Sequence, residues 1–210
     1  MKNFFTVVSE KNPKISVQVA TGHFATGSAH RSHYIDIFDL KSNSTVAKHA
    51  AREMAASYRS NTIVDVIVYM DGTEVLAAYL AEELLQPGAM NDGGEILIIT
   101  PMIRADGRFV FHQNVQEKII NKNAILIVAS MSTGATSNSV LECLDFYGCN
   151  LVGISAVFSA VPEAGDRKIY SLFSTVEIPD YWFCSPSDCP LCKEGRKIDA
   201  VFSSEGYTEL

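Results

Sequence analysis

The sequence predicts an α/β fold with a mainly parallel central sheet flanked by helices. Short apolar runs at 63–69, 125–128 and 151–158 have the length of buried strands, and segments with helical spacing of apolar residues lie between them. Repeated alternation of strand and helix is typical of a parallel sheet with helices on its faces. The chain of 210 residues contains no internal repeat or low-complexity linker, so we expect a single domain over 1–210.

Each expected element follows from its local pattern. Alternation of Ile15, Val17 and Val19 with polar residues predicts a half-buried strand, whereas apolar residues three to four positions apart predict helices. In chain order the expected elements are a strand at 15–19, a helix at 45–58 capped by Ser44 or Thr45, a strand at 63–69, a helix at 74–85, a strand at 95–100, a hairpin around 104–108, a short helix at 115–120, the strand at 125–128, a helix ending at Gly148 and a strand at 151–158.

Composition argues against several classes of protein. The net charge of −7 and the lack of a Lys/Arg run argue against nucleic acid as a partner, because phosphate neutralisation requires a basic face. No apolar run approaches the ~18 residues that span a bilayer, and Met1–Phe5 gives way to polar residues too soon for a signal peptide. Five cysteines, an odd number, fit a reducing cytoplasm better than a disulfide scaffold.

The segment 124–136 has the pattern of a phosphate-binding turn. A buried strand, a hydroxylated turn with a glycine and an amphipathic helix follow one another there. Free N–H groups in the first helical turn and the helix dipole favour an anion, and hydroxyls add donors. The alternative is an ordinary strand-to-helix turn with a Ser/Thr cap. The candidate phosphate-binding residues are Ser132, Thr133, Gly134, Ala135 and Thr136.

The segment 22–36 is unusually rich in side chains that could contact a planar ligand. Histidines, serines, an arginine and a tyrosine lie close together there and would offer both donors and an aromatic face. The alternative is a surface hairpin whose histidines and arginine are solvated. The candidate residues for contact with such a ligand are Ser28, His30 and Tyr34.

Two further loops should lie beside the phosphate-binding turn. In an open α/β sheet, ligands bind beyond the carboxyl ends of the strands, and both loops follow expected strands. Taken alone, the first is more simply a polar turn. The candidate residues in these loops are Asp71, Gly72, Thr73, Arg104 and Arg108.

Three cysteines near the C-terminus, Cys184, Cys189 and Cys192, have the spacing Cys-x4-Cys-x2-Cys. Two thiolates on one tight turn can reach the same tetrahedral zinc ion, but a complete site needs a fourth ligand, and none lies nearby in the sequence. Zinc or another metal, reduced free thiols and a redox role are therefore all open. Cys143 and Cys149 are more simply buried small apolar residues.

Two of these segments together resemble the type I phosphoribosyltransferases, and among them the orotate phosphoribosyltransferases. The likeness extends over 15–195 and implies that family's fold, with 1–40 as an N-terminal hood and 180–210 as a cysteine-containing C-terminal segment. It also implies a homodimer that uses 5-phosphoribosyl-1-pyrophosphate (PRPP) with Mg²⁺. The matching residues are Gly22, His23, Phe24, Ser28, His30, Ser32, Tyr34 and the turn Ser132–Thr136.

The resemblance assigns a role to each candidate loop. The turn Ser132–Thr136 would hold the 5-phosphate, and the segment 22–36 would orient the base. The loop at 71–73, together with Arg104 or Arg108, would hold the pyrophosphate.

The sequence departs from the family where two acids normally precede the phosphate-binding turn. Aligned without a gap they fall on Val128 and Ala129, and with a one-residue shift on Ala129 and Ser130. Asp71 and Glu74 would also repel a pyrophosphate unless a divalent cation bridges them. At ~5 Å and an effective dielectric of ~20 that repulsion is ~3 kcal/mol for each pair of charges.

Two functions are therefore open. The first is an orotate phosphoribosyltransferase-like enzyme that joins a pyrimidine-type base to PRPP in nucleotide biosynthesis or salvage. The second is a module that retains the fold and senses a nucleoside monophosphate without turning it over. We favour the enzyme, because groups elsewhere in the fold could replace the missing acids.

The phosphate-binding turn generates a direct prediction. Gly134→Val should abolish binding of a 5-phosphorylated ligand, because a side chain there clashes with the ligand or demands a disfavoured φ. Thr133→Ala should weaken binding about tenfold or more, since a hydrogen bond to a charged group contributes roughly 1.5–3 kcal/mol. Titration with a nucleoside monophosphate and its dephosphorylated form, with circular dichroism as the folding control, checks both. Wild-type affinity in Gly134→Val would show that the assignment is wrong.

Overall fold

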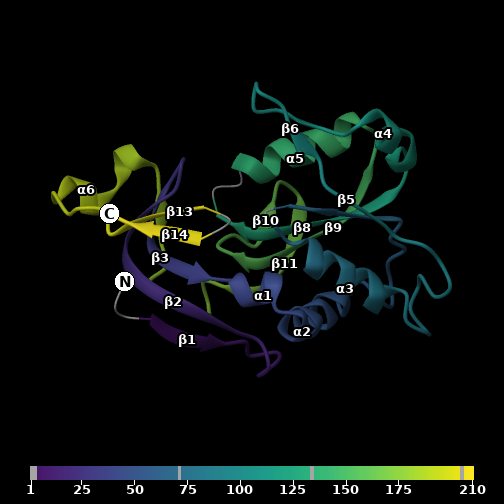
Figure 1. The fold of residues 1–210 in the computed structure, drawn as a ribbon, viewed down its shortest axis with the longest axis horizontal. Coiled ribbons are helices and arrows are strands. Elements are labelled where there is room, and N and C mark those ends of the chain that lie inside the picture. The colour runs from purple at the N-terminus through teal and green to yellow at the C-terminus, as the bar shows by residue number, and fades with distance from the viewer. Residues whose placement is uncertain (1–3, 71, 133–134, 204–205) are drawn as a thin grey trace.

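The computed structural model describes residues 4–70, 72–132, 135–203 and 206–210. Within these residues the strands form two six-stranded sheets and a two-stranded hairpin. In Figure 1 the sheet built from the two ends of the chain lies at the left, and the central sheet with its long helices lies at the right. No helix in the described part of the chain is long and apolar enough to cross a membrane.

The central sheet is mainly parallel, which confirms the predicted α/β fold. Its strand order is β10-β11-β9-β8-β4-β5, and every neighbouring pair is parallel except β10 with β11. The strands are β4 (Val66–Tyr69), β5 (Leu97–Ile99), β8 (Asn123–Met131), β9 (Asn150–Ser159), β10 (Glu163–Ala164) and β11 (Arg167–Ser174).

Helices bury both faces of the central sheet (Figure 1). Successive side chains of a strand point to opposite faces, so Ile125 and Ile127 of β8 belong to one hydrophobic cluster and Leu126 and Val128 to the other. The first cluster includes residues of α2 (Ser44–Ala55) and α3 (Glu74–Leu84), and the second includes residues of α4 (Gln113–Ile119) and α5 (Ala135–Phe146).

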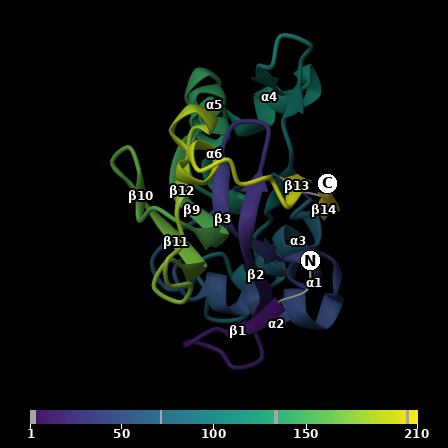
Figure 2. The same cartoon turned by 90° about the vertical axis from the view of Figure 1, so that its left-hand side faces the viewer.

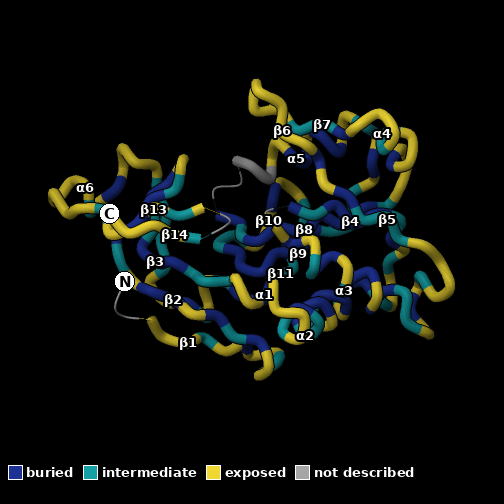
Figure 3. The backbone as a smooth tube through the Cα atoms, viewed as in Figure 1, coloured by how far each residue is buried: buried dark blue, intermediate teal, exposed yellow. Residues whose placement is uncertain are grey.

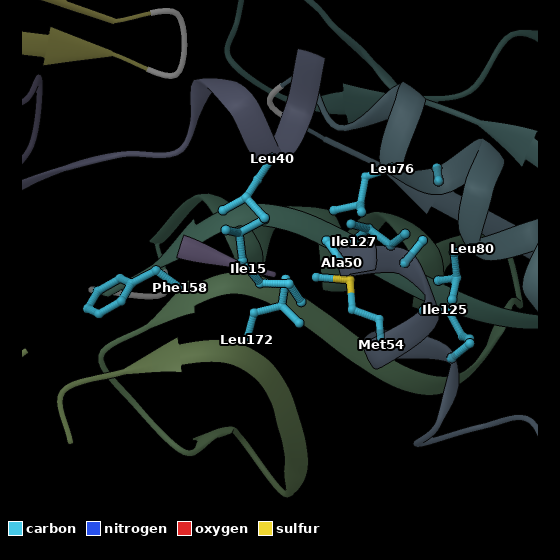
Figure 4. Close-up of a cluster of buried hydrophobic side chains, with 14 of the residues drawn as sticks. Ile15, Leu40, Ala50, Met54, Leu76, Leu80, Ile125, Ile127, Phe158 and Leu172 are labelled. Atoms are coloured by element: carbon cyan, nitrogen blue, oxygen red, sulfur yellow. The ribbon is translucent and has the colours of Figure 1, made fainter. Parts of the chain in front are cut away.

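Figure 4 shows part of the first cluster, where Met54 of α2 and Leu80 of α3 meet Ile125 of β8. Ile125 and Leu80 are fully buried, and full burial of such a side chain contributes about 1.5–3 kcal/mol. Figure 3 shows the same pattern along the chain, with buried strands at the centre and exposed loops around them. This packing fixes the position of the carboxyl end of β8.

The second sheet joins the two ends of the chain. Its order is β12-β3-β2-β13-β14, with β1 also paired to β2. Figures 1 and 2 show the C-terminal strands beside the N-terminal ones. Its strands are β1 (Phe4–Val8), β2 (Ser16–Ala25), β3 (His30–Asp36), β12 (Phe183–Cys184), β13 (Ala200–Ser203) and β14 (Gly206–Glu209). The short elements are α1 (Phe38–Ser42), η1 (Pro186–Asp188) and α6 (Pro190–Lys193).

The elements expected for the central sheet are present, and the structure adds β10 and β11 to them. The hairpin around 104–108 is confirmed as β6 (Met102–Ile103) paired with β7 (Phe109–Val110). The cap of α2 was predicted wrongly: the Asn43 side chain, rather than Ser44 or Thr45, accepts hydrogen bonds from the first turn. Strand β11 was not predicted, because polar residues interrupt its apolar run.

A glycine on β9 makes room for a buried tyrosine. The Tyr58 ring packs so closely over Gly153 that a Cβ there would lie 2.3 Å from the ring. The Tyr58 hydroxyl is 2.8 Å from the Ser155 Oγ, and the ring is nearly fully buried. Burial raises the pKa of Tyr58 well above its usual range, so the phenol stays protonated. The close approach therefore requires glycine at this position.

We expect Gly153→Ala to lower the free energy of unfolding by about 1–3 kcal/mol, because the added methyl group overpacks the site. The matched control is Gly27→Ala, where an added Cβ meets nothing within 4 Å. Urea denaturation of the two variants and the wild type measures the difference. Equal stability of Gly153→Ala and the wild type would contradict the packing argument.

Candidate functional site

A cavity of about 310 Å³ lies between the carboxyl end of the central sheet and the second sheet. The end of β4 contributes Met70, and the end of β8 contributes Val128, Ala129 and Ser130. Most of the remaining lining comes from the β2–β3 turn, β3, α1 and the β13–β14 hairpin, and Val140, Phe158 and Tyr181 complete it. The position beyond the ends of two parallel strands is where α/β sheets bind ligands.

The cavity carries positive charge although the chain as a whole is acidic. Arg31 and Lys41 line it, and Asp36 is the acid among the described lining residues. The Arg31 guanidinium donates to the Ser132 Oγ at 2.7 Å and lies 5.3 Å from the centroid of the Phe202 ring. Its Nε is buried without a hydrogen-bond partner among the described residues. This charge balance and the open donor favour an anionic ligand.

Asp36 ends β3 and Lys41 lies on the helix α1 that follows, and both residues line the cavity. Lys41 is only 8% exposed, and its Nζ lies 3.5 Å from where a Cβ on Gly72 would stand. Asp36 accepts a hydrogen bond from the Phe38 N–H at 3.0 Å. The ammonium group therefore faces the loop after β4.

Aromatic rings form one side of the cavity. The rings of Tyr34 and Phe202 are 5.3 Å apart, and those of Phe158 and Tyr181 are 4.8 Å apart. Burial, with the nearby Asp36 and Tyr207, raises the pKa of Tyr34 to about 12. The phenol of Tyr34 is therefore a neutral hydrogen-bond donor at neutral pH, beside rings on which a planar ligand can stack.

His33 stacks on Tyr181 at 5.9 Å and lies 2.7 Å from the Ser32 Oγ through its Nδ1. Burial lowers the pKa of His33, and the nearby Asp180 only partly opposes this effect. The imidazole is therefore neutral at neutral pH and offers one donor and one acceptor.

The structure places Ser132, the first residue of the predicted phosphate-binding turn, beside the cavity rather than in its lining. Ser132 is buried and hydrogen-bonded to Arg31. Thr133 and Gly134 lie outside the described residues. Ala135 and Thr136 form the start of α5. The turn thus leads from the end of β8 into a helix, as the sequence predicted.

The predicted pyrophosphate-binding residues are not gathered in one place. Asp71 lies outside the described residues. Gly72 has a φ of +71°, and the buried Thr73 side chain donates to the Met70 carbonyl at 2.7 Å rather than lining the cavity. Arg104 and Arg108 are exposed on the β6–β7 turn and do not line the cavity.

The predicted base-binding residues divide into two groups. Ser28 and Tyr34 line the cavity. His30 does not: its Nδ1 lies 3.0 Å from the His23 Nε2 and 3.4 Å from the Cys192 Sγ. Burial and the neighbouring His23 lower the pKa of His30.

The positions that should carry the family's two acids are visible in the cavity wall. Val128 and Ala129 are each 3% exposed, and Ser130 follows them. Neither alignment therefore restores a carboxylate. The exposed Glu74 does not line the cavity either.

Among the C-terminal cysteines, two join a group that the sequence did not reveal. Ligand atoms of His23, His30, Cys189 and Cys192 lie within 4.8 Å of one another. Cys184 is not one of the four, although its backbone pairs with His30 in the second sheet.

Cys143 and Cys149 are buried as expected. Burial raises the pKa of each thiol to about 11. Both therefore remain neutral thiols at neutral pH.

Sequence reasoning missed Lys41 and gave no role to Arg31 or His23. The pattern Gly22-His23-Phe24 was noticed only as part of a resemblance. The sequence does place His23 and His30 on two strands of one hairpin, where their side chains can lie close together. Their contact with Cys189 and Cys192 depends on the fold and is not visible in the sequence.

No family model matches the chain. In sequence it is 25% identical over 191 residues to an orotate phosphoribosyltransferase of Chlorobaculum parvum, with 89% of this chain and 90% of that protein covered. It is also 25% identical over 139 residues to an orotate phosphoribosyltransferase of Thermotoga petrophila, with 61% and 71% covered.

Among solved structures, a UMP synthase of Leishmania donovani matches with a TM-score of 0.56 and 19% identity, covering 76% of this chain and 34% of that one. The chain thus spans about a third of that protein. An orotate phosphoribosyltransferase of Mycobacterium tuberculosis matches with a TM-score of 0.50 and 13% identity, covering 78% and 93%. An adenine phosphoribosyltransferase of Thermoanaerobacter pseudethanolicus matches with a TM-score of 0.50 and 14% identity, covering 68% and 88%.

The fold and the cavity at the ends of β4 and β8 define the class: the chain has the fold of the type I phosphoribosyltransferases. Within that class its sequence is similar to the orotate phosphoribosyltransferases. Its motif for PRPP is degenerate, because the two acids before the turn are absent.

Proposed function

We propose that the chain is an orotate phosphoribosyltransferase-like enzyme that joins a pyrimidine-type base to PRPP in nucleotide biosynthesis or salvage. The observation that carries this proposal is the single cavity that combines Arg31 and Lys41 with a wall of aromatic rings. One ligand with an anionic part and a planar part fits such a lining. In this proposal the second sheet is the hood that covers the cavity. The homodimer and the cytoplasmic location expected from the sequence stay predictions.

In this proposal the 5-phosphate lies at the turn after β8. The start of α5 offers N–H groups, and the Ser132 hydroxyl already contacts Arg31. The buried Nε of Arg31 is a further donor for a phosphate oxygen. These groups hold the phosphate by charge-assisted hydrogen bonds.

The base lies against the second sheet. Tyr34 donates from its neutral phenol, Ser28 offers a hydroxyl at the β2–β3 turn, and Phe202 offers a ring face. Together these groups orient a flat heterocycle above the reacting carbon. Orientation of this kind lowers the barrier by removing freedom of motion before the reaction.

The leaving pyrophosphate gains negative charge as its bond to the ribose breaks. Lys41, next to the loop after β4, is the described cation placed to stabilise that charge. Lys41 thus takes the pyrophosphate-binding role that the sequence analysis gave to Arg104 and Arg108. Those two arginines would reach the cavity only if the β6–β7 hairpin moved toward it.

The family's magnesium fits this cavity poorly. Mg²⁺ prefers carboxylates together with substrate phosphates, but Val128 and Ala129 occupy the positions of the two acids. Asp36 supplies the one carboxylate among the described lining residues, and that carboxylate also accepts a hydrogen bond from the Phe38 N–H. We therefore assign no step of the reaction to a metal ion.

One observation favours a second function, binding of a nucleoside monophosphate without turnover. The apolar Val128 and Ala129 leave the phosphate-binding turn in place but remove the groups that would contact the ribose hydroxyls. A monophosphate receptor needs no pyrophosphate site, and the described arginines of the expected site lie outside the cavity.

We expect the wild-type protein to release pyrophosphate from PRPP only when a suitable base is present. A panel of pyrimidine and purine bases, with and without Mg²⁺, identifies the substrate, and a coupled pyrophosphate assay measures it. Calorimetry on the same protein separates the two functions. Absence of turnover, with a nucleoside monophosphate bound at least as tightly as PRPP, would overturn the enzyme and support the receptor.

We further expect Arg31→Met to weaken binding of uridine 5′-monophosphate about 10- to 100-fold, since it removes a hydrogen bond to a charged group worth roughly 1.5–3 kcal/mol. The control Arg59→Met changes an arginine that bonds the Pro87 carbonyl and does not line the cavity. Calorimetric titration compares the variants with the wild type. Equal affinity of Arg31→Met and the wild type would exclude Arg31 from the phosphate site.

A further inference from the structure

We propose that His23, His30, Cys189 and Cys192 form a structural zinc site that fastens the C-terminal segment to the second sheet. The four side chains come from three separate parts of the chain. His23 lies on β2, His30 begins β3, Cys189 is the N-cap residue of α6 and Cys192 lies within that helix. The argument for this site does not rest on the proposed transferase activity.

Four of the six distances between the ligand atoms are close to the edges of a tetrahedron around one ion. The His23 Nε2 and His30 Nδ1 are 3.0 Å apart. The Cys192 Sγ lies 3.6 Å from the His23 Nε2 and 3.4 Å from the His30 Nδ1, and the Cys189 Sγ lies 3.3 Å from the His23 Nε2. With zinc bonds of about 2.0–2.3 Å, a tetrahedron has edges of roughly 3.3 Å between nitrogens and about 3.6 Å between nitrogen and sulfur.

The tautomer of His23 supports the same conclusion independently. Its Nδ1 lies 3.1 Å from the carbonyl oxygens of both Arg196 and Lys197. Carbonyl oxygens only accept, so the Nδ1 carries the proton and the Nε2 presents its lone pair to the cluster. A backbone carbonyl that fixes the far nitrogen is the usual outer partner of a metal-binding histidine.

The backbone of His23, like its ring, is fixed by two hydrogen bonds to the C-terminal segment. Its N–H donates to the Asp199 Oδ2 at 2.7 Å, and its carbonyl accepts from the Asp199 N–H at 2.8 Å. Gly22 must be glycine for this approach, since a Cβ there would lie 2.8 Å from the same carboxylate oxygen. The segment from the cysteines to Asp199 therefore wraps around one histidine.

The chemistry and burial of the four ligands point to zinc in a closed site. Two nitrogens and two sulfurs in tetrahedral arrangement suit Zn²⁺, and four protein ligands leave no position for a substrate. His23 and Cys189 are fully buried, whereas Cys192 is exposed and provides a route of entry for the ion. The role is therefore to hold structure rather than to catalyse.

The position of the site explains what the ion would stabilise. His30 is followed directly by Arg31, which reaches the turn after β8 through Ser132. An ion bound at His30 fixes the start of β3 and so limits where Arg31 can move. It also joins segments about 160 residues apart in sequence, and an ion that binds the folded chain but not the unfolded one stabilises the fold by its binding free energy.

The full-length protein, purified under reducing conditions, should contain about one zinc ion per chain by elemental analysis. After replacement with Co²⁺, its spectrum should show the intense visible bands of tetrahedral cobalt and a thiolate charge-transfer band from two sulfurs. Cys192→Ser should weaken metal binding by more than about 100-fold, because losing an inner ligand costs more than losing an outer partner. Cys184→Ser, which changes a neighbouring thiol outside the group, should retain the metal.

Chelation should lower the Tm of the wild type by more than about 5 °C and leave that of Cys192→Ser nearly unchanged. Several results would overturn the proposal. They are a folded wild type that holds neither Zn²⁺ nor Co²⁺, a Cys189–Cys192 disulfide in the reduced preparation, another metal preferred over zinc, or equal loss of metal in Cys184→Ser and Cys192→Ser.

Discussion

Strand β8 is buried on both faces, and this constraint positions the rest of the molecule. Ile125, Leu126 and Ile127 are fully buried in two opposite clusters, so the strand cannot shift by one residue without exchanging its faces. The end of β8 is therefore fixed relative to β4, which pairs with it in parallel. The cavity forms where these fixed ends meet the second sheet, and its geometry depends on packing far from any ligand.

The second sheet shows a different kind of dependence, because it needs both ends of the chain. β2 pairs with β3 locally, but β13 and β12 come from more than 140 residues further on. The hydrogen bonds between His23 and Asp199 and the cluster of two histidines with two cysteines lie at this junction. Cavity residues Arg31 and Phe202 come from the two ends, so closing the chain ends assembles part of the site.

Most of the central sheet could be predicted from the sequence, whereas the contacts that join the two ends of the chain could not. Apolar runs such as 125–128 are local patterns, so the strand β8 and the helix α5 that follows it were predicted correctly in type and order, and phosphate binding between them stays a prediction. The group of His23 and His30 with Cys189 and Cys192 could not be predicted, because the histidines approach the cysteines only in the folded chain. Lys41 lies in a short helix without a distinct pattern, and only its burial beside Gly72 gives it a role.

The missing acids separate two properties that the fold normally combines. Donors at a helix start favour a phosphate, and in this chain Ser132 precedes α5 and contacts Arg31. Turnover requires groups that act more strongly on the transition state than on the bound ligand, and Val128 and Ala129 supply none. If the chain is the enzyme proposed above, catalysis would depend on cations from the second sheet and α1, above all Lys41 near the loop after β4. If those cations bind ligand and transition state equally, the same cavity is a receptor, since uniform binding does not accelerate a reaction.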